Sequence, residues 1–204
     1  MYCYSSDAVA LRDGNGKALS TDSKIGVKTS FSPTEGRSVQ FATRATEDMM
    51  ECFTPDEAGI GVYYENGGLY LVKTYDTIYQ KGNAFYTDEA CSNAISGVTT
   101  LARAVGIAQT IVFVGSYEVT SDETVTIPAG RTVTLLRYAN FKNISMLGLA
   151  SGGTFTFNAP SASSKLIMDG NNVNTTGAKG AMIYINNDAN NKFVLKGCSG
   201  DNQN

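Results

Sequence analysis

The chain of 204 residues contains no histidine and no tryptophan, and only four prolines. Without histidine, these residues cannot build a Ser-His-Asp or Cys-His catalytic arrangement, or a zinc site with a histidine ligand. Charged residues are also scarce, at 17%, and the formal net charge is −3 with the basic residues scattered along the chain. Because phosphate binding needs a concentrated basic surface, this composition argues against a nucleic-acid partner.

Long apolar runs are missing as well. No stretch approaches the roughly 20 apolar residues that span a bilayer, so we expect no membrane insertion. The first residues lack the basic start and apolar centre of a signal peptide. Few charges together with 21 glycines and many Thr and Asn residues are typical of extracellular β-proteins. We therefore expect an extracellular or cell-surface location, with signal and anchor outside this chain.

The cysteines are few and widely spaced: Cys3, Cys52, Cys91 and Cys198. They form no CxxC pair, so the sequence favours no structural metal site. In an oxidising compartment four cysteines allow three disulfide pairings, which the sequence does not rank. Unpaired buried thiols are an equally open interpretation.

Short runs of Val, Ile and Thr, separated by tight polar breaks, dominate the second half of the chain. They predict strands at 111–114, 124–127, 132–136, 154–157, 165–170, 181–185 and 192–197. The segment 128–131 contains Pro, which fixes φ, and Gly, which supplies a positive φ, so it predicts a corner. Strand units restart after about 20 to 30 residues, as from Thr132 to Thr154, which is typical of a solenoid.

A helix is predicted directly before these strands. Thr87 suits an N-cap, and an apolar stripe with spacings of three and four runs from Cys91 to Val105. Such a helix would cover the open first coil of a solenoid. We expect residues 87–204 to form this capping helix and a partial parallel β-helix of about two to three coils. After Leu195 no closing cap follows, so we expect the natural protein to continue beyond Asn204.

Residues 1–86 lack the solenoid rhythm, and we expect them to form a small antiparallel β-unit. Asn66-Gly67 lies between apolar runs at 62–64 and 69–72, which predicts a hairpin with a two-residue turn. A second hairpin is expected around 13–16, a strand at 38–42 and a loop at 54–59.

Residues 85–200 resemble the start of right-handed parallel β-helix domains of the pectate-lyase-like kind, found in large bacterial surface and secreted proteins. The likeness rests on the Ala-rich segment 90–105, the strand at 110–117, VTIPAGRTVTL at 125–135 and LIMDGNN at 166–172. The resemblance implies a mainly β fold with a right-handed β-helix. Enzymes of this kind act on polysaccharides and use acidic residues, in lyases together with calcium.

The function expected from these features is that of an extracellular or cell-surface structural or adhesive module, non-catalytic within these residues. Its expected partner is a polysaccharide or a host or cell-surface ligand. The alternative is the N-terminal part of a carbohydrate-active enzyme, a polysaccharide lyase or glycoside hydrolase. No pair of carboxyl groups of the kind that glycosidases need can be recognised in the sequence, so we assign no catalytic residue.

Asp169 is the first candidate for a carbohydrate- or calcium-binding residue, because it ends a predicted strand beside Asn171 and Asn172. Asp188 follows about one coil later. Calcium takes several oxygen ligands, which these four residues offer, and no other cofactor is expected. The competing interpretation is a turn in which the Asp and Asn side chains bond the backbone.

Two further features suit either sugar binding or structure. Asn is dense between Asn171 and Asn191, where stacked amides can form ladders between coils. A second group of side chains can stack on sugar rings or simply pack on a small sheet: Tyr63, Tyr64, Tyr70 and Tyr75.

Overall fold

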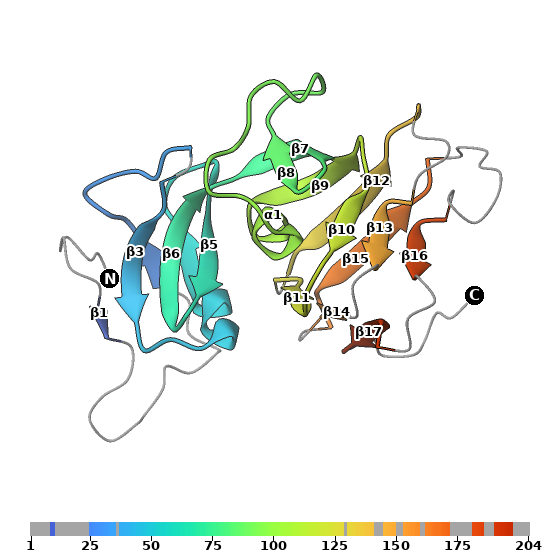
Figure 1. The fold of residues 1–204 in the computed structure, drawn as a ribbon. Helices are drawn as coiled ribbons and strands as arrows, with labels where there is room; N and C mark the ends of the chain where they lie inside the picture. The colour runs from blue at the N-terminus through green and yellow to red at the C-terminus, as the bar shows by residue number, and fades with distance from the viewer. Residues whose placement is uncertain are drawn as a thin grey trace. The chain divides into compact units, whose positions relative to one another are not determined.

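The computed structural model describes residues 9–10, 25–35, 37–128, 130–140, 145–149, 153–159, 162–171, 181–185 and 190–197. The fold is mainly β, as predicted (Figure 1). The chain divides into two compact units, Met1–Tyr75 and Asp76–Asn204. This division comes earlier than the boundary expected at residue 86, because the strand that begins at Tyr75 joins a sheet of the second unit.

The first unit contains short strands and one 3-10 helix: β1 (Val9–Ala10), β2 (Ile25–Val27), β3 (Val39–Thr43), η1 (Glu47–Cys52), β4 (Phe53–Pro55), β5 (Ile60–Glu65) and β6 (Gly68–Lys73). Strands β5 and β6 pair in antiparallel fashion around Asn66 and Gly67. Both turn residues have positive φ, 48° and 77°, as a type I′ turn requires, so the predicted hairpin is confirmed.

The unit is nevertheless mixed, and the expectation of a purely antiparallel unit is wrong. Strand β1 runs parallel to β3, and β2 runs parallel to β4. In both pairs the two strands are far apart in sequence, and long connections permit parallel pairing where tight turns do not. The second hairpin expected around 13–16 lies outside the described residues.

A small apolar core holds the first unit together. Phe41 of β3 meets Phe53 of β4 edge to face, with ring centroids 5.2 Å apart. Leu69 and Leu71 of β6 and Met49 of η1 are buried in the same cluster. Such a core is small, but burial of apolar area at roughly 25 cal/mol per Å² makes it the main stabilising term of this unit.

The second unit begins with a hairpin and a short helix and continues with nine strands: β7 (Tyr75–Lys81), β8 (Ala84–Tyr86), α1 (Leu101–Ile107), β9 (Ala108–Phe113), β10 (Tyr117–Val119), β11 (Glu123–Thr126), β12 (Thr132–Arg137), β13 (Leu147–Leu149), β14 (Thr154–Asn158), β15 (Lys165–Asp169), β16 (Ile183–Ile185) and β17 (Lys192–Lys196).

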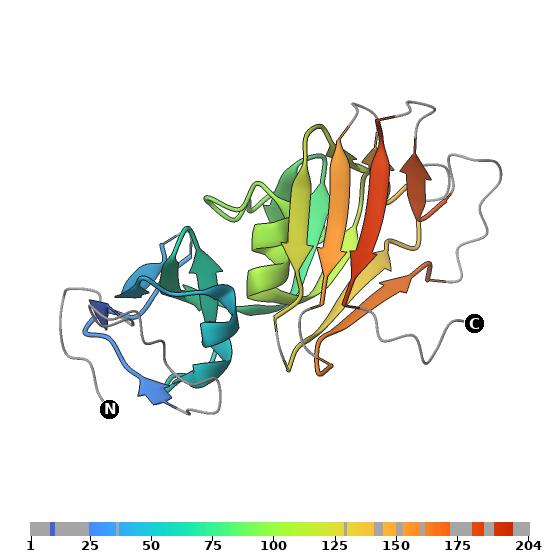
Figure 2. The same cartoon turned by 90° about the horizontal axis from the view of Figure 1, so that it is seen from below.

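From β9 onward, each strand pairs in parallel with the third strand after it. The pairings build the sheets β10-β13-β16 and β11-β14-β17, and β9, β12 and β15 form the parallel part of a five-stranded sheet that β7 and β8 extend. Figure 2 shows the yellow, orange and red strands of one sheet side by side.

The repeat lengthens along the chain. Thr110 pairs with Thr134 and Tyr117 pairs with Leu147, which are 24 and 30 positions apart and within the expected spacing, whereas later partners are further apart. Thr132 pairs with Lys165, not with the coil position near Thr154, and Thr154 pairs with Lys192. The spacing from Thr132 to Thr154 therefore joins two strands that belong to different sheets. Between β12 and β14 the chain forms the three-residue strand β13, just as it forms β10 between β9 and β11. Strands this short show no periodicity in the sequence.

Inward side chains fill the space between the sheets. In β12 the pattern is alternating, with Val133 and Leu135 fully buried. Phe155 of β14 stacks on Phe193 of β17 with ring planes 11° apart, because their strands are paired in register. The predicted corner is also confirmed: Gly130 has φ +70°, and the Arg131 N–H donates to the Pro128 carbonyl at 3.2 Å.

The predicted helix from Cys91 to Val105 is mostly wrong. The helix α1 starts only at Leu101, with Thr100 as N-cap, and the preceding residues form turns. Asp88 accepts hydrogen bonds from the backbone N–H groups of Ser92 and Asn93 at 3.1 and 2.7 Å, which closes a turn in place of a helical start. The buried residues of α1 pack against β9 and β11.

Candidate functional site

The residues predicted for carbohydrate or calcium binding lie at the end of β15. Asp169 is exposed, and its Oδ1 accepts a hydrogen bond from the Asn171 N–H at 2.7 Å. Asn171 has φ +52°, a left-handed conformation that Asn tolerates better than most residues. The geometry is the Asx turn of the competing interpretation.

The other two predicted site residues, Asn172 and Asp188, lie outside the described residues. Within the described ranges, no three acidic or Cys side chains come together in a way that could hold a metal ion. The amide of Asn171 is used elsewhere: its Nδ2 donates to the Arg137 carbonyl of β12 at 3.0 Å. The structure therefore uses Asp169 and Asn171 to order the backbone.

Other polar side chains of the second unit also form hydrogen bonds with the backbone. The Asn191 Nδ2 donates to the Leu149 carbonyl at 3.1 Å, which links the approach to β17 with β13. The Thr154 N–H donates to Asp122 Oδ1 at 2.7 Å, which links the start of β14 with the turn before β11. Each of these bonds joins segments that are more than thirty residues apart. They hold one layer of strands onto the next.

The tyrosines of the first unit do not form one cluster. Tyr63 and Tyr70 are paired across the β5–β6 hairpin, whereas Tyr64 packs against the apolar core. Tyr75 lies under the Lys73 ammonium group, which is 5.3 Å from the ring centroid. Tyr63 and Tyr70 are therefore cross-strand neighbours on one face of the hairpin, a placement that suits stacking on a sugar ring.

A buried polar constellation at the start of α1 was not apparent in the sequence. The Tyr117 hydroxyl accepts from the Leu101 N–H at 3.0 Å and donates to Glu123 Oε2 at 2.8 Å. The Glu123 Oε1 accepts from the Ala102 N–H at 3.1 Å. Burial, and then the charge of Glu123, raise the pKa of Tyr117 well above its ordinary value.

The other end of α1 is held by Arg131. Its Nη1 and Nη2 donate to the carbonyls of Gly106 and Ala108 at 2.7 and 2.8 Å. Burial lowers the pKa of this guanidinium, which nevertheless stays charged in proteins. A negative group at the helix start and a cation at its end both suit the helix dipole. The constellation therefore stabilises α1, and its chemistry is used for that purpose.

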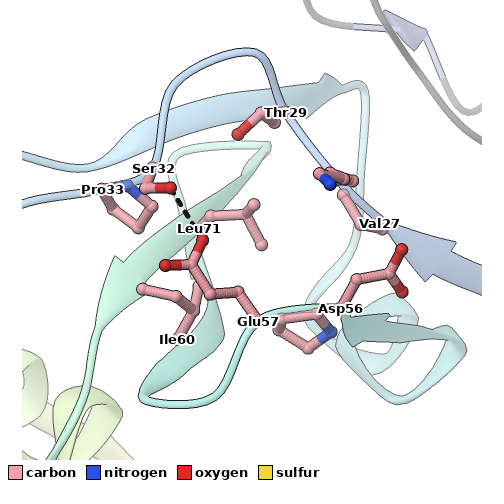
Figure 3. A pocket seen from close by; sticks show the side chains of 10 residues that line it. Val27, Thr29, Ser32, Pro33, Asp56, Glu57, Ile60 and Leu71 are labelled. Atoms are coloured by element: carbon pink, nitrogen blue, oxygen red, sulfur yellow. Dashed lines mark hydrogen bonds between the residues drawn. The ribbon is translucent and has the colours of Figure 1, made fainter.

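The first unit contains a cavity of about 230 Å³ (Figure 3). Val27 and Leu71 give it an apolar floor, and Asp56 and Glu57 bring carboxylates to it. The Ser32 Oγ donates to Glu57 Oε2 at 2.7 Å, which fixes that carboxylate. The cavity is smaller than the roughly 300–1,000 Å³ of sites for drug-sized ligands. It can offer hydrogen-bond acceptors to the hydroxyl or amine groups of a small ligand.

Only one part of this cavity could be predicted from the sequence. The loop at 54–59 was predicted, but its contact with Ser32 joins residues 25 positions apart and has no local pattern. Of the cysteines, Cys52 is buried and Cys91 is a partly exposed free thiol, whereas Cys3 and Cys198 lie outside the described residues.

Comparison of the chain with protein-family models, with curated proteins and with solved structures gave no match. Among the described residues, no helix has the length and apolar character that crossing a membrane requires. Any functional conclusion therefore depends on the geometry described above.

Proposed function

We propose that the second unit is a partial right-handed parallel β-helix that serves as a structural or adhesive element of an extracellular or cell-surface protein. The pairing of each strand with the third strand after it supports a coil of three strands. Parallel strands joined by crossover connections are right-handed in about 98% of cases, which supports the handedness. The sparse charge and the many Gly, Thr and Asn residues support the location.

The observation that carries this proposal is that polar side chains of the second unit form hydrogen bonds with its backbone. Asp122, Asn171 and Asn191 bond the backbone of a neighbouring layer, and Glu123 and Arg131 hold the two ends of α1. Polar side chains that bond the backbone of neighbouring strands in this way stiffen the element and fix its surface. Such an element suits a scaffold that presents itself to a polysaccharide or a host or cell-surface ligand.

The location is tested on intact source cells. An antibody against the chain, or an added protease, should reach the protein without lysis of the cells. Detection only after lysis, with a cytoplasmic marker released in parallel, would overturn the extracellular assignment.

The competing enzymatic function is tested by product release from a panel of acidic and neutral polysaccharides, with and without calcium. We expect binding without turnover for the wild-type chain, and the same result for Asp169→Ala. Turnover that Asp169→Ala abolishes would replace the structural function by catalysis at the end of β15. Asp76→Asn serves as the matched control, since it changes an exposed carboxylate on β7, which is separated from β15 by two strands of the same sheet.

A further inference from the structure

The cavity of the first unit is formed by segments that the fold brings together. Its lining comes from the loop after β2, the end of β4, and strands β5 and β6, and all of these residues belong to the described part of the unit. Val27 and Leu71 on its floor are 5% and 3% exposed and belong to the apolar core of the unit. The floor of the cavity therefore has its shape without a ligand.

Two carboxylates flank this floor, and contacts within the unit hold each of them (Figure 3). Glu57 accepts the hydrogen bond from the Ser32 hydroxyl. The Asp56 N–H donates to the Val27 carbonyl at 3.1 Å. The Asp56 carboxylate lies over Gly26, where a Cβ atom would come within 2.9 Å of its Oδ1. Because both carboxylates are held in this way, binding a ligand costs them little conformational entropy.

The charged groups of the lining select the kind of ligand. Asp56 and Glu57 bring two negative charges, and Lys28 brings one positive charge to the same cavity. An ammonium group donates three hydrogen bonds and has the charge that carboxylates attract. Lys28 would repel a ligand that carries only a positive charge, whereas it would attract the carboxylate of a zwitterion. The lining therefore fits a ligand with one ammonium and one carboxylate group.

The volume of the cavity selects the size of the ligand. At about 30 Å³ for each water molecule in the liquid, 230 Å³ corresponds to about eight atoms of that size. An amino acid with a short aliphatic side chain fits this volume, and a hexose is larger. Val27, Ile60 and Leu71 offer apolar contacts to such a side chain. Among the described residues that line the cavity there is no aromatic ring on which a sugar could stack.

We infer that the first unit binds a free amino acid with a small aliphatic side chain, such as valine, in this cavity. Asp56 and Glu57 hold its ammonium group, and Lys28 meets its carboxylate. Its side chain lies on Val27 and Leu71. The site belongs to the first unit, so the inference goes beyond the structural function proposed for the second unit and does not depend on it.

Titration calorimetry of the full chain with L-valine tests the site, and we expect saturable binding. N-acetylvaline has no ammonium group and should not bind. Valinamide keeps the ammonium group and loses the carboxylate, so it should bind more weakly than valine. Lys28→Gln should weaken the binding of valine and leave that of valinamide unchanged, because only valine offers a carboxylate to Lys28. Glucose should not bind.

Substitutions in the lining test the two carboxylates. Asp56→Asn and Glu57→Gln should each weaken the binding of valine about tenfold, since each removes a charged hydrogen-bond acceptor. Glu35→Gln is the matched control, with the same charge change at an exposed residue of the unit outside the lining. Gly26→Ala keeps every charge but displaces the Asp56 carboxylate, so it should also weaken binding. Circular dichroism spectra should stay unchanged for the two lining variants, because both side chains are exposed.

The absence of saturable valine binding to the wild-type chain would overturn the inference. So would equal binding of valine and N-acetylvaline, or equal effects of Asp56→Asn and Glu35→Gln. Glucose binding that Asp56→Asn abolishes would replace the amino acid by a sugar as the ligand of this cavity. None of these results bears on the location or the structural function proposed for the second unit, which are tested on intact cells and with polysaccharides.

Discussion

The start of α1 depends on the hydroxyl group of Tyr117. The substitution Tyr117→Phe removes this group with little change in the shape of the side chain. The Tyr117 side chain is 2% exposed and Leu101 is fully buried. Without the hydroxyl, the Leu101 N–H loses its acceptor and Glu123 Oε2 loses a donor. Water cannot readily replace these partners, because the aromatic ring continues to fill the site.

The expected cost follows from the buried donor. A buried polar group left without a partner costs about 1–3 kcal/mol, so we expect Tyr117→Phe to lower the free energy of unfolding of the second unit by about 2 kcal/mol. For a unit of this size that corresponds to a fall of roughly 8 °C in Tm. Hydrogen exchange should show the loss first at the amides of Leu101 and Ala102.

The matched control is Tyr138→Phe, which removes a hydroxyl that donates to Glu89 Oε1 at 2.6 Å on the surface. There water replaces the lost partner, so we expect a distinctly smaller change in Tm. Equal losses for the two variants, or unchanged exchange at Leu101 in Tyr117→Phe, would refute the role assigned to the buried hydroxyl.

The same hydroxyl predicts a dependence on alkaline pH. The folded state raises the pKa of Tyr117 above its ordinary value of 10.0, mainly through burial. The resulting stabilisation is complete below pH 10 and is lost as pH rises from 10 toward the folded-state value, because only the unfolded chain releases the proton there. The stability difference between wild type and Tyr117→Phe should therefore narrow above pH 10, as denaturant titrations at each pH would show.

Three further changes are expected to act on the second unit. Arg131→Met removes both donors to the end of α1 and should cost about 2 kcal/mol by urea unfolding, with unchanged stability arguing against the clamp. Asn171→Gly keeps the left-handed turn but loses the amide bond, at about 1 kcal/mol, whereas Asn171→Ala adds strain of about 1 kcal/mol more; the reverse order in thermal melts would contradict this. Leu101→Asp or Val105→Asp buries an unpaired carboxylate and should unfold the unit in circular dichroism spectra, whereas an unchanged melting curve would mean that α1 does not cover the stack.

Much of the strand pattern was determined by the sequence itself. The runs at 111–114, 124–127, 132–136, 154–157 and 192–197 each coincide with a strand of the structure to within one residue at the C-terminal end. The corner at 128–131 and the Asn66-Gly67 hairpin form as expected. These features depend on local preferences. β-branched residues favour extended backbone, and Pro and Gly fix a turn wherever the chain places them.

The helix prediction failed because the apolar pattern behind it is local, whereas the start of the helix depends on residues far away in the chain. An apolar stripe from Cys91 to Val105 fits a helix, yet Asp88 caps a turn and Cys91 has φ +54°. The helix begins only where Tyr117 and Glu123, contributed by later strands, bond its first N–H groups. A single sequence does not show which distant side chains will satisfy a helix end.

The candidate sites divide in the same way. That Asp169 and Asn171 lie in a turn follows from their neighbours, because an Asx turn closes within a few residues. That Ser32 meets Glu57 at a cavity depended on how segments far apart in the chain come together. The sequence determined where the chain extends and turns, since these choices are made residue by residue. Only the tertiary structure decided which strands pair and where α1 begins and ends, because each depends on contacts between residues far apart in the chain.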